Sequence, residues 1–360
     1  MISLVTTLAF ILRGIPSIEI SKIDWSNTFS SRRDMPSTPP KRILYGEHNQ
    51  SLRCIVRATG NGGRLGNQMF TIASAYGLAR LHACHLSIAT APFTLTNTSF
   101  RLDLTPLLIS TDLFTSIVND TTQNIRQMTA DVGCEYRSDM TRPNAIPSGS
   151  ILTLRGYWQS YLHFAKYADE LRERVFVPTQ SILQTVSQFF ARIHKHKFDD
   201  HTEFSSTDFH TLKKQLAQSI DATWIGVHVR RTDFADMSHS SSDTYLFNAM
   251  AHFTELYPGA HFVVASDDKS YCQSLFRDRS NVFVAPRSFS PGDDMAALTL
   301  CKHSIITGGS FGWWAGFLAN GEVLHDREYP SGCASREQYY PPWFLLDGKA
   351  RAQRYGNYTL

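Results

Sequence analysis

The chain has 360 residues, of which 42% are hydrophobic and 19% are charged, and its formal net charge is +3. A chain of this size can bury a substantial core and is long enough for two domains. A net charge this close to zero does not indicate a nucleic-acid-binding protein, which would carry a strong excess of basic residues. The sequence has neither a repeat of fixed period nor a low-complexity tract.

The N-terminal segment is apolar over residues 2–12 until Arg13 interrupts the run. A membrane-spanning helix needs about 20 such residues and the apolar part of a signal peptide about 7–15. The run is too short for a full anchor, and it lacks the basic flank and the small-residue cleavage site of a signal peptide. It is therefore interpreted as a shortened anchor, a signal peptide or neither. The proline-containing residues 13–50 are interpreted as a stem.

The first glycine-rich segment follows a predicted strand at 52–56 and runs from Gly60 to Asn67, after which an apolar helix is predicted from Phe70. Free backbone N–H groups and the helix dipole make such a helix start a ready anion site. The spacing fits neither the dinucleotide fingerprint nor the P-loop. Glycines also serve ordinary tight turns, and that alternative stays open.

The apolar run at 223–227 is predicted to belong to the next strand, and it leads into the sequence His-Val-Arg-Arg-Thr-Asp-Phe-Ala-Asp at 228–236. Alternation along a strand puts residues 225, 227 and 229 on one face, and His228 and Arg230 on the other. Adjacent arginines at the end of a buried strand require an anion, and the guanidinium fork suits a carboxylate or a phosphate. The alternative is a structural ion pair with Asp233 or Asp236.

Two further apolar strands end in small and polar residues. The strand at 261–266 leads into Asp267 and Asp268, and the strand at 303–306 leads through glycines to Ser310 and Phe311. In open α/β sheets the carboxyl ends of the strands line the ligand crevice. The alternative for the first strand is that Ser266 or Asp267 caps the next helix.

After the last of these strands, Ser310 is predicted as the N-cap of an aromatic helix. Its hydroxyl is placed to meet a phosphate, and the Phe311 ring is placed to stack on a base. Trp313 and Trp314 are expected in the core, because small residues nearby allow close packing.

Amphipathic helices are predicted at 181–196 and 209–219, with a polar linker or exposed loop between them at 197–208. The following half alternates strand and helix, which predicts a doubly wound α/β domain. We therefore predict an N-terminal domain over residues 51–205 and a C-terminal domain over residues 206–360.

No metal site is expected. The chain contains no Asp-x-Asp motif, and the adjacent pairs Asp267–Asp268 and Asp293–Asp294 direct their side chains apart. His82 and His85 are spaced to share a ligand, but a histidine pair without a carboxylate partner favours a structural role.

Six widely spaced cysteines allow up to three disulfides in an oxidising compartment. Cys84 and Cys301 lie inside apolar segments and are the candidates for buried free thiols. Four glycosylation sequons, at Asn49, Asn97, Asn119 and Asn357, agree with a secretory route.

Taken together, the ordered motifs resemble those of the α-1,2-fucosyltransferases, a glycosyltransferase family 11 type of sequence. The resemblance covers roughly Arg53 to Leu324. It rests on the segments at 63–70, 155–161, 228–233, 265–268 and 300–314.

The resemblance implies a GT-B-like fold, in which two Rossmann-like domains face a donor cleft. It implies inverting transfer of L-fucose from GDP-β-L-fucose to the 2-hydroxyl of a galactoside, without a metal or other cofactor. It also implies a single-pass type II Golgi membrane protein with a lumenal catalytic part, held in the membrane by the N-terminus if the anchor is intact. His-x-Arg-Arg is shared with α-1,6- and protein O-fucosyltransferases, so it indicates the donor and not the acceptor.

The resemblance also implies roles for individual residues. Arg230 is assigned to the diphosphate, Asn67 to the sugar–phosphate junction, and Asp233 is a candidate base whose basicity an arginine would lower. Arg231 is interpreted as a more structural member of the donor site. The predicted donor-binding residues are Gly63, Gly66, His228, Arg231, Ser266, Asp267, Ser310 and Phe311.

Two positions depart from the family pattern, which has Ser-Ser-Phe-Ser-Trp-Trp where this chain has glycine at 309 and 312. These glycines remove hydroxyls and support one alternative, a non-catalytic lumenal glycan-binding relative. A second alternative is a protein O-fucosyltransferase, although Trp313, Trp314 and the segment 156–160 favour the α-1,2 type.

Overall fold

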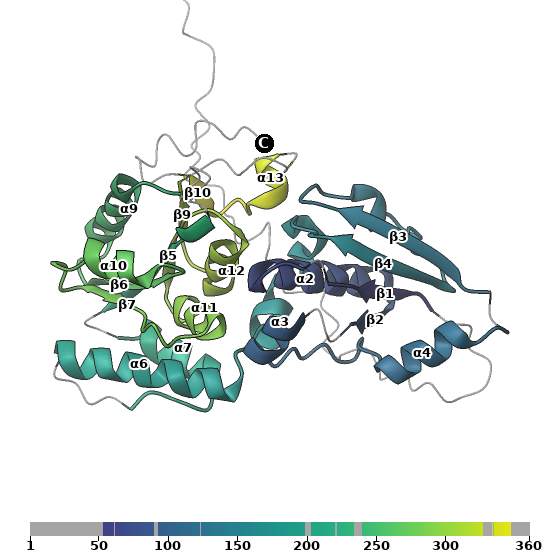
Figure 1. Ribbon diagram of the computed structural model, residues 1–360, viewed down its shortest axis with the longest axis horizontal. Coiled ribbons are helices and arrows are strands. Elements are labelled where there is room, and N and C mark those ends of the chain that lie inside the picture. Colours follow the sequence, from purple (N-terminus) through teal and green to yellow (C-terminus); the bar gives the residue numbers. More distant parts are fainter. Residues whose placement is uncertain are drawn as a thin grey trace, which may run out of the picture. The chain divides into compact units, whose positions relative to one another are not determined.

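The structure is a computed structural model that describes residues 53–60, 62–89, 93–122, 124–198, 203–219, 222–233, 240–326, 333 and 335–346. All of these residues lie within one compact unit, residues 48–360. Figure 1 shows that this unit contains two α/β halves, each built around its own sheet. The apolar run at 2–12, the stem and the sequons at Asn49 and Asn357 lie outside the described residues.

The first half is built on a four-stranded sheet in the order β2-β1-β4-β3, in which every neighbouring pair is parallel. The strands are β1 (Ile55–Ala58), β2 (His85–Ile88), β3 (Arg126–Val132) and β4 (Ser150–Gly156). Helix α2 (Leu65–His82) connects β1 to β2. The strand predicted at 52–56 corresponds to β1, which lies slightly later in the chain.

Short helices complete this half. They are α3 (Thr94–Ser99), α4 (Thr111–Asn119), η3 (Ser138–Thr141), η4 (Tyr161–His163), η5 (Ala165–Tyr167), α5 (Ala168–Glu170) and η6 (Leu171–Val175). The sequon residue Asn97 lies on α3 and Asn119 ends α4, and both residues are exposed.

The second half is built on a six-stranded sheet in the order β10-β9-β8-β5-β6-β7, again with parallel pairs. Its strands are β5 (Thr223–Val229), β6 (Ala260–Ser266), β7 (Val282–Val284), β8 (His303–Ile306), β9 (Val323–His325) and β10 (Phe344–Leu346). Its helices are α9 (Asp243–Leu256), α10 (Lys269–Leu275), α11 (Pro291–Thr299), α12 (Ser310–Ala319) and α13 (Arg336–Tyr339). Strand and helix alternate along the chain, so the α/β fold with two Rossmann-like halves is confirmed.

Two helices precede the second sheet. Helix α6 (Gln180–Phe198) and helix α7 (Phe209–Ala217) confirm the amphipathic segments predicted at 181–196 and 209–219. The Phe190 ring of α6 meets the Trp224 ring of β5 with centroids 5.3 Å apart, so α6 packs on the core of the second half. The domain boundary at 205/206 stays a prediction.

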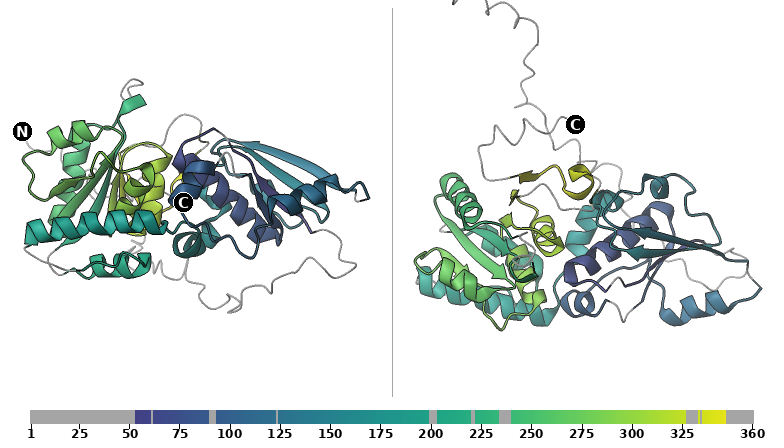
Figure 2. Two further views of the ribbon diagram at one scale, coloured as in Figure 1. Left: turned by 60° about the horizontal axis from the view of Figure 1, so that its bottom comes forward. Right: turned by 45° about the horizontal axis from the view of Figure 1, so that its top comes forward.

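The two halves meet along helices α2 and α12, which lie side by side between the sheets (Figures 1 and 2). The Phe70 ring of α2 lies 4.5 Å from the Trp313 ring and 5.1 Å from the Trp314 ring, centroid to centroid. Both tryptophans are fully buried, which confirms their predicted place in the core. One apolar cluster therefore continues from the first half into the second.

Two disulfides join segments that are distant in sequence, Cys54–Cys84 and Cys134–Cys333. The interpretation of Cys84 as a free thiol is wrong. Because Ile55 pairs with His85 across neighbouring strands β1 and β2, the preceding residues Cys54 and Cys84 stand opposite each other. Cys301 is a buried free thiol as predicted, and so is Cys272.

No helix in the described ranges is long and apolar enough to cross a membrane.

Candidate functional site

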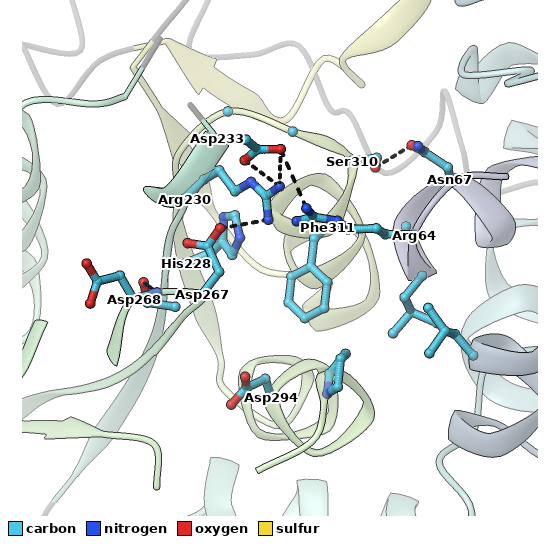
Figure 3. A pocket seen from close by; sticks show the side chains of 18 of the residues that line it. Arg64, Asn67, His228, Arg230, Asp233, Asp267, Asp268, Asp294, Ser310 and Phe311 are labelled. Atoms are coloured by element: carbon cyan, nitrogen blue, oxygen red, sulfur yellow. Dashed lines mark hydrogen bonds and ion pairs between the residues drawn. The ribbon is translucent and has the colours of Figure 1, made fainter. Parts of the chain in front are cut away.

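A pocket of about 840 Å³ is lined by both halves of the molecule (Figure 3). From the first half come the turn before α2, the first turn of α2 and the segment after β4. From the second half come the ends of β5 and β6, the start of α11 and the turn before α12. Most of the sequence-predicted donor residues line it: Gly63, Gly66, Asn67, His228, Arg230, Asp233, Ser266, Asp267, Ser310 and Phe311.

Arg230 follows directly after β5, with its backbone N–H donating to the Thr307 hydroxyl at 2.8 Å. Its guanidinium bonds Asp233 on one side, at 2.6 and 2.8 Å, and Asp267 on the other, at 2.8 Å (Figure 3). The predicted ion pair with Asp233 is therefore present, but it is only half of a clamp that fixes the guanidinium plane in the pocket wall. Asp236 lies outside the described residues.

Asp233 also lies 3.8 Å from the guanidinium of Arg64, which belongs to the first half. Partial burial acts to raise the pKa of the Asp233 carboxyl, but the hydrogen bond from Arg230 and the charges of Arg230 and Arg64 outweigh it. The pKa of Asp233 is therefore below its usual value. Such a carboxylate is a weak base, which counts against Asp233 as the group that deprotonates an acceptor.

Asp267 supports the segment that carries both arginines. Its carboxylate accepts the Arg231 backbone N–H at 2.9 Å and the Thr232 hydroxyl at 2.5 Å, besides the pair with Arg230. The Arg231 guanidinium instead lies over the Tyr271 ring, 4.0 Å from its centroid. Arg231 is not among the residues that line the pocket, and its predicted place among the donor-binding residues stays a prediction.

The cap of helix α10 is neither Ser266 nor Asp267. Asp268 is the N-cap, and its side chain accepts the Tyr271 backbone N–H at 3.0 Å. Ser266 ends β6, and its hydroxyl accepts the Asp268 backbone N–H at 2.9 Å. The alternative that Ser266 or Asp267 caps the helix is therefore wrong, because the cap lies one or two residues later, at Asp268. Asp267 instead holds Arg230.

His228 is buried beneath Phe311, and the two rings stack with centroids 5.3 Å apart. Burial lowers the pKa of His228 to about 4, against the opposing charge of Asp267. The imidazole is therefore neutral at physiological pH and supports the Phe311 ring. Gly312 lies against this imidazole, because a Cβ at position 312 would be 2.4 Å from His228 Nδ1.

Helix α12 begins at Ser310, with Gly309 as its N-cap. The prediction of Ser310 as N-cap is wrong, because Gly309 takes up the non-helical conformation, with a φ of 98° that favours glycine. Both departures from the family pattern thus have a local structural reason.

Helix α2 begins at Leu65, so Gly66 and Asn67 belong to its first turn and not to the preceding loop as predicted. A Cβ on Gly66 would lie 2.7 Å from the backbone of Ser310 and Phe311. Gly66 is therefore needed for the close approach of two helix N-termini. Both of these positive dipole ends face the pocket.

Asn67 connects the two halves through its carboxamide oxygen. This Oδ1 accepts the Ser310 hydroxyl at 2.7 Å and the Gln159 amide at 2.6 Å (Figure 3 shows the first bond). With Oδ1 held twice, the amide N–H2 of Asn67 is the group left to donate toward the pocket. The role of Gln159 was not foreseen, although its segment was recognised.

Asp294 is the principal residue that the sequence analysis missed. It follows the capping box of α11, formed by Ser290 and Asp293, and its Oδ2 lies 2.9 Å from Lys269 Nζ. Its Oδ1 is buried in the pocket wall without a hydrogen-bond partner among the described residues. Burial raises the pKa of Asp294 to about 7, although Lys269 opposes the shift.

No group of three or more histidine, cysteine or acidic residues in the described ranges is arranged to hold a metal ion. His82 Nε2 contacts the Met140 carbonyl oxygen at 2.8 Å. Asp267 and Asp268 bind different partners, as do Asp293 and Asp294. The predicted divergence of both pairs is confirmed.

The chain is similar to known glycosyltransferases over most of its length. The sequence model of glycosyl transferase family 11 matches residues 176–326. Galactoside alpha-(1,2)-fucosyltransferase 2 of Pongo pygmaeus is 29% identical over 74% of this chain and 70% of its own length. Galactoside alpha-(1,2)-fucosyltransferase 1 of Ateles belzebuth is 26% identical over 78% and 72%.

Two further similarities are found. Galactoside 2-alpha-L-fucosyltransferase Sec1 of Mus musculus is 28% identical over 73% of this chain and 64% of its own. The solved fucosyltransferase NodZ from Bradyrhizobium is a more distant likeness, with 14% identity and a TM-score of 0.46 over 78% of this chain and 97% of that one. The resemblance predicted from the sequence is confirmed: the chain is similar to glycosyl transferase family 11 and to galactoside α-(1,2)-fucosyltransferases.

Proposed function

We propose that the protein transfers L-fucose from GDP-β-L-fucose to the 2-hydroxyl of a galactoside with inversion, and that it needs no divalent metal or other cofactor. The observation that carries this proposal is the clamped Arg230 guanidinium, which lies in one pocket with two converging helix N-termini. The names of the relatives support the sugar and the linkage.

The leaving group explains the need for positive charge. Inverting transfer expels GDP, so the site must stabilise negative charge that develops on the diphosphate in the transition state. Arg230 supplies a fixed cation, and α2 and α12 supply backbone N–H groups and positive dipole ends. Because Asp233 and Asp267 hold the guanidinium before the donor arrives, little reorganisation is needed at the moment of reaction.

Asp294 suits the guanine base. Guanine presents adjacent N1–H and N2–H2 donors, and a carboxylate can accept both. The buried Oδ1 of Asp294 lacks a partner among the described residues, and Lys269 keeps the carboxylate in place through Oδ2. Phe311, supported by His228, offers a ring face on which the base can stack.

Asn67 suits the junction between sugar and diphosphate, because it lines the pocket and its Oδ1 already accepts from Ser310 and Gln159, which leaves the amide N–H2 as its side-chain donor. The Ser310 hydroxyl donates to Asn67, so Ser310 is proposed to reach phosphate through its backbone N–H at the first position of α12. Deprotonation of the acceptor is not assigned to Asp233, because that carboxylate is ion-paired to two arginines.

A lumenal location in the Golgi membrane belongs to the same proposal. Two disulfides suit an oxidising compartment, and the sequon residues Asn97 and Asn119 are exposed. The membrane attachment would lie in the N-terminal residues outside the described ranges.

The test is a transfer assay with the purified full-length chain, labelled GDP-fucose and a glycan array. Incorporation on terminal galactosides, with an α-1,2 linkage in the product established by NMR, is the expected result. Incorporation only on folded cysteine-rich protein modules would favour a protein O-fucosyltransferase. Galactoside binding without transfer or donor hydrolysis would favour the non-catalytic relative.

A further inference from the structure

Tyr157 is an exposed aromatic residue inside the pocket. It follows β4 and lines the same pocket as Asn67 and Arg230, yet 43% of its surface remains accessible. Within the described part of the chain its ring stacks on no other ring and its hydroxyl makes no hydrogen bond. A large ring face is therefore available in the pocket, and burying it would be favourable.

The backbone holds Tyr157 in place from the preceding side. Gly156 has a φ of 80°, and a Cβ there would lie 2.3 Å from the Val132 carbonyl oxygen. That oxygen accepts the backbone N–H groups of both Tyr157 and Trp158, at 2.8 and 3.1 Å. The turn is thus fixed against β3 in a conformation that requires glycine.

Trp158 holds the turn from the following side. It is fully buried, although its φ of 53° is one that non-glycine residues rarely adopt. Its indole N–H donates to the Arg155 carbonyl at 2.7 Å, and its own carbonyl accepts the Ser74 hydroxyl at 3.0 Å. Two unusual conformations on either side of one exposed ring indicate that the ring is positioned for a function.

The wall around Tyr157 differs from the rest of the pocket in charge. Gln159, two residues later, donates to Asn67, so the ring stands on the turn that also orients Asn67. In the first half, the lining residues Leu95, Asn67 and Gln159 are uncharged and the exposed Arg64 is the exception, whereas Arg230, Asp233 and Asp267 are on the opposite half. A mostly uncharged wall with one open ring suits a sugar better than a diphosphate.

We propose that the Tyr157 ring is the platform on which the acceptor's terminal galactosyl residue stacks. This inference rests on the proposed function for the choice of galactoside. One face of galactose presents a patch of C–H groups, because its axial 4-hydroxyl points to the opposite side. These C–H groups are attracted to the negative face of an aromatic ring, and the contact would hold the 2-hydroxyl beside Asn67.

The central experiment compares Tyr157→Ala, Tyr157→Leu and Tyr157→Phe at saturating GDP-fucose, with a galactoside as acceptor. Tyr157→Ala and Tyr157→Leu should raise the acceptor KM by about tenfold, while Tyr157→Phe, which keeps the ring, should stay near wild type. The affinity for GDP, measured by calorimetry, should be unchanged in all three variants. Leu256→Ala is the control, because Leu256 is similarly exposed but does not line the pocket.

Three results would overturn the inference. An acceptor KM that is the same in Tyr157→Ala as in wild type would show that the ring does not hold the acceptor. A loss of GDP affinity in Tyr157→Ala would place the ring against the nucleotide instead. A leucine variant that binds acceptor as well as the phenylalanine variant would also count against stacking.

A binding measurement separates this inference from the proposed function. Saturation-transfer NMR of a β-galactoside in the presence of GDP detects acceptor binding without any fucosyl transfer. If wild type binds the galactoside but transfers no fucose, and Tyr157→Ala loses the binding, the proposed function fails and the platform stands. If wild type shows no galactoside contact, or Tyr157→Ala keeps it, the platform fails whatever the transfer assay shows.

Discussion

The two walls of the pocket are built from different kinds of residue. The second half contributes charged groups, which include Arg230, Asp233, Asp267, Lys269 and Asp294. The first half contributes mostly uncharged groups, including Asn67, Tyr157 and Gln159; Arg64, whose side chain is 68% exposed, is its charged exception. The difference matches the two parts of the proposed reaction, because a nucleoside diphosphate needs charge and a sugar needs hydrogen bonds and a ring.

The walls meet at the seam between Gly66 and Ser310, where two helix N-termini come into backbone contact. Asn67 crosses this seam by its bond to Ser310. Substitutions on the charged wall should therefore weaken binding of the diphosphate and the base. Substitutions on the mostly uncharged wall should weaken binding of the acceptor, and substitutions at the seam should slow the transfer step itself.

The largest effect is expected from Arg230→Lys, on the charged wall. Lysine keeps the charge but is a point donor that cannot bridge Asp233, Asp267 and two phosphate oxygens with a planar fork. Loss of one transition-state donor of this kind costs roughly 3–4 kcal/mol, so the kcat for transfer should fall by about 100- to 1,000-fold.

The matched control is Arg231→Lys, one residue further along. The Arg231 guanidinium stacks on Tyr271 outside the pocket lining, so its replacement should lower thermal stability more than turnover. A near-normal kcat in Arg230→Lys, or equal losses of kcat in the two variants, would indicate that the diphosphate binds in another part of the pocket.

The charged wall was also the part that the sequence predicted best. Arg230, His228 and Asp267 follow apolar strands, and the carboxyl ends of parallel strands converge whatever the details of packing. Trp313 and Trp314 were assigned to the core by their small neighbours. These are local signals, and the structure places all five residues as the strand and helix patterns indicated.

The contact at the seam and the position of Asp294 could not be predicted from residues that are close in sequence. Gly66 looked like a turn glycine, but its reason for being glycine is Ser310, which is 244 positions later in the chain. The Cys54–Cys84 bond depends on the register of two strands. Asp294 sits beside a capping box, so its sequence context suggested a helix start and gave no sign of a buried carboxyl in a pocket.

The second prediction tests Asp294 as the guanine-binding group. Because hydrogen bonds to a charged group are worth about 1.5–3 kcal/mol, Asp294→Ala should weaken GDP binding by roughly 10- to 100-fold. Calorimetry measures this directly, and Asp278→Asn, an exposed carboxyl in the same half, is the control. Unchanged GDP affinity in Asp294→Ala would show that guanine does not bind at this end of the pocket.

The pH dependence of GDP affinity gives an independent check on the same residue. Burial raises the pKa of Asp294 to about 7, so the free protein carries a neutral acid below that pH and a carboxylate above it. Guanine donors require the carboxylate, so GDP affinity should fall as the pH is lowered, by about tenfold between pH 8 and pH 6. Asp294→Asn should remove the part of this dependence that comes from the Asp294 carboxyl and leave only that of the GDP terminal phosphate, whose second pKa is about 6.

The third prediction contrasts the seam with the charged wall. Asn67→Ala removes an uncharged donor at the junction, so transfer should fall by about tenfold while GDP affinity stays close to wild type. Asp267→Ala frees the Arg230 guanidinium and the backbone of Arg231, so it should chiefly weaken GDP binding. An equal loss of GDP affinity in both variants, measured by calorimetry, would contradict this division between the walls.

The smallest expected effect is that of metal removal, which should leave transfer unchanged. In the family of reactions that use a divalent ion, the ion neutralises the diphosphate, and here Arg230 and two helix N-termini are proposed to carry that charge. We therefore expect the initial rate of the full-length enzyme to be the same with EDTA as with added manganese. Arg230→Lys provides a sharper version of the assay, because manganese should not restore its lost activity. If EDTA abolishes transfer and manganese restores it, the charged wall does not neutralise the diphosphate alone, and the assignment of Arg230 to the leaving group is wrong.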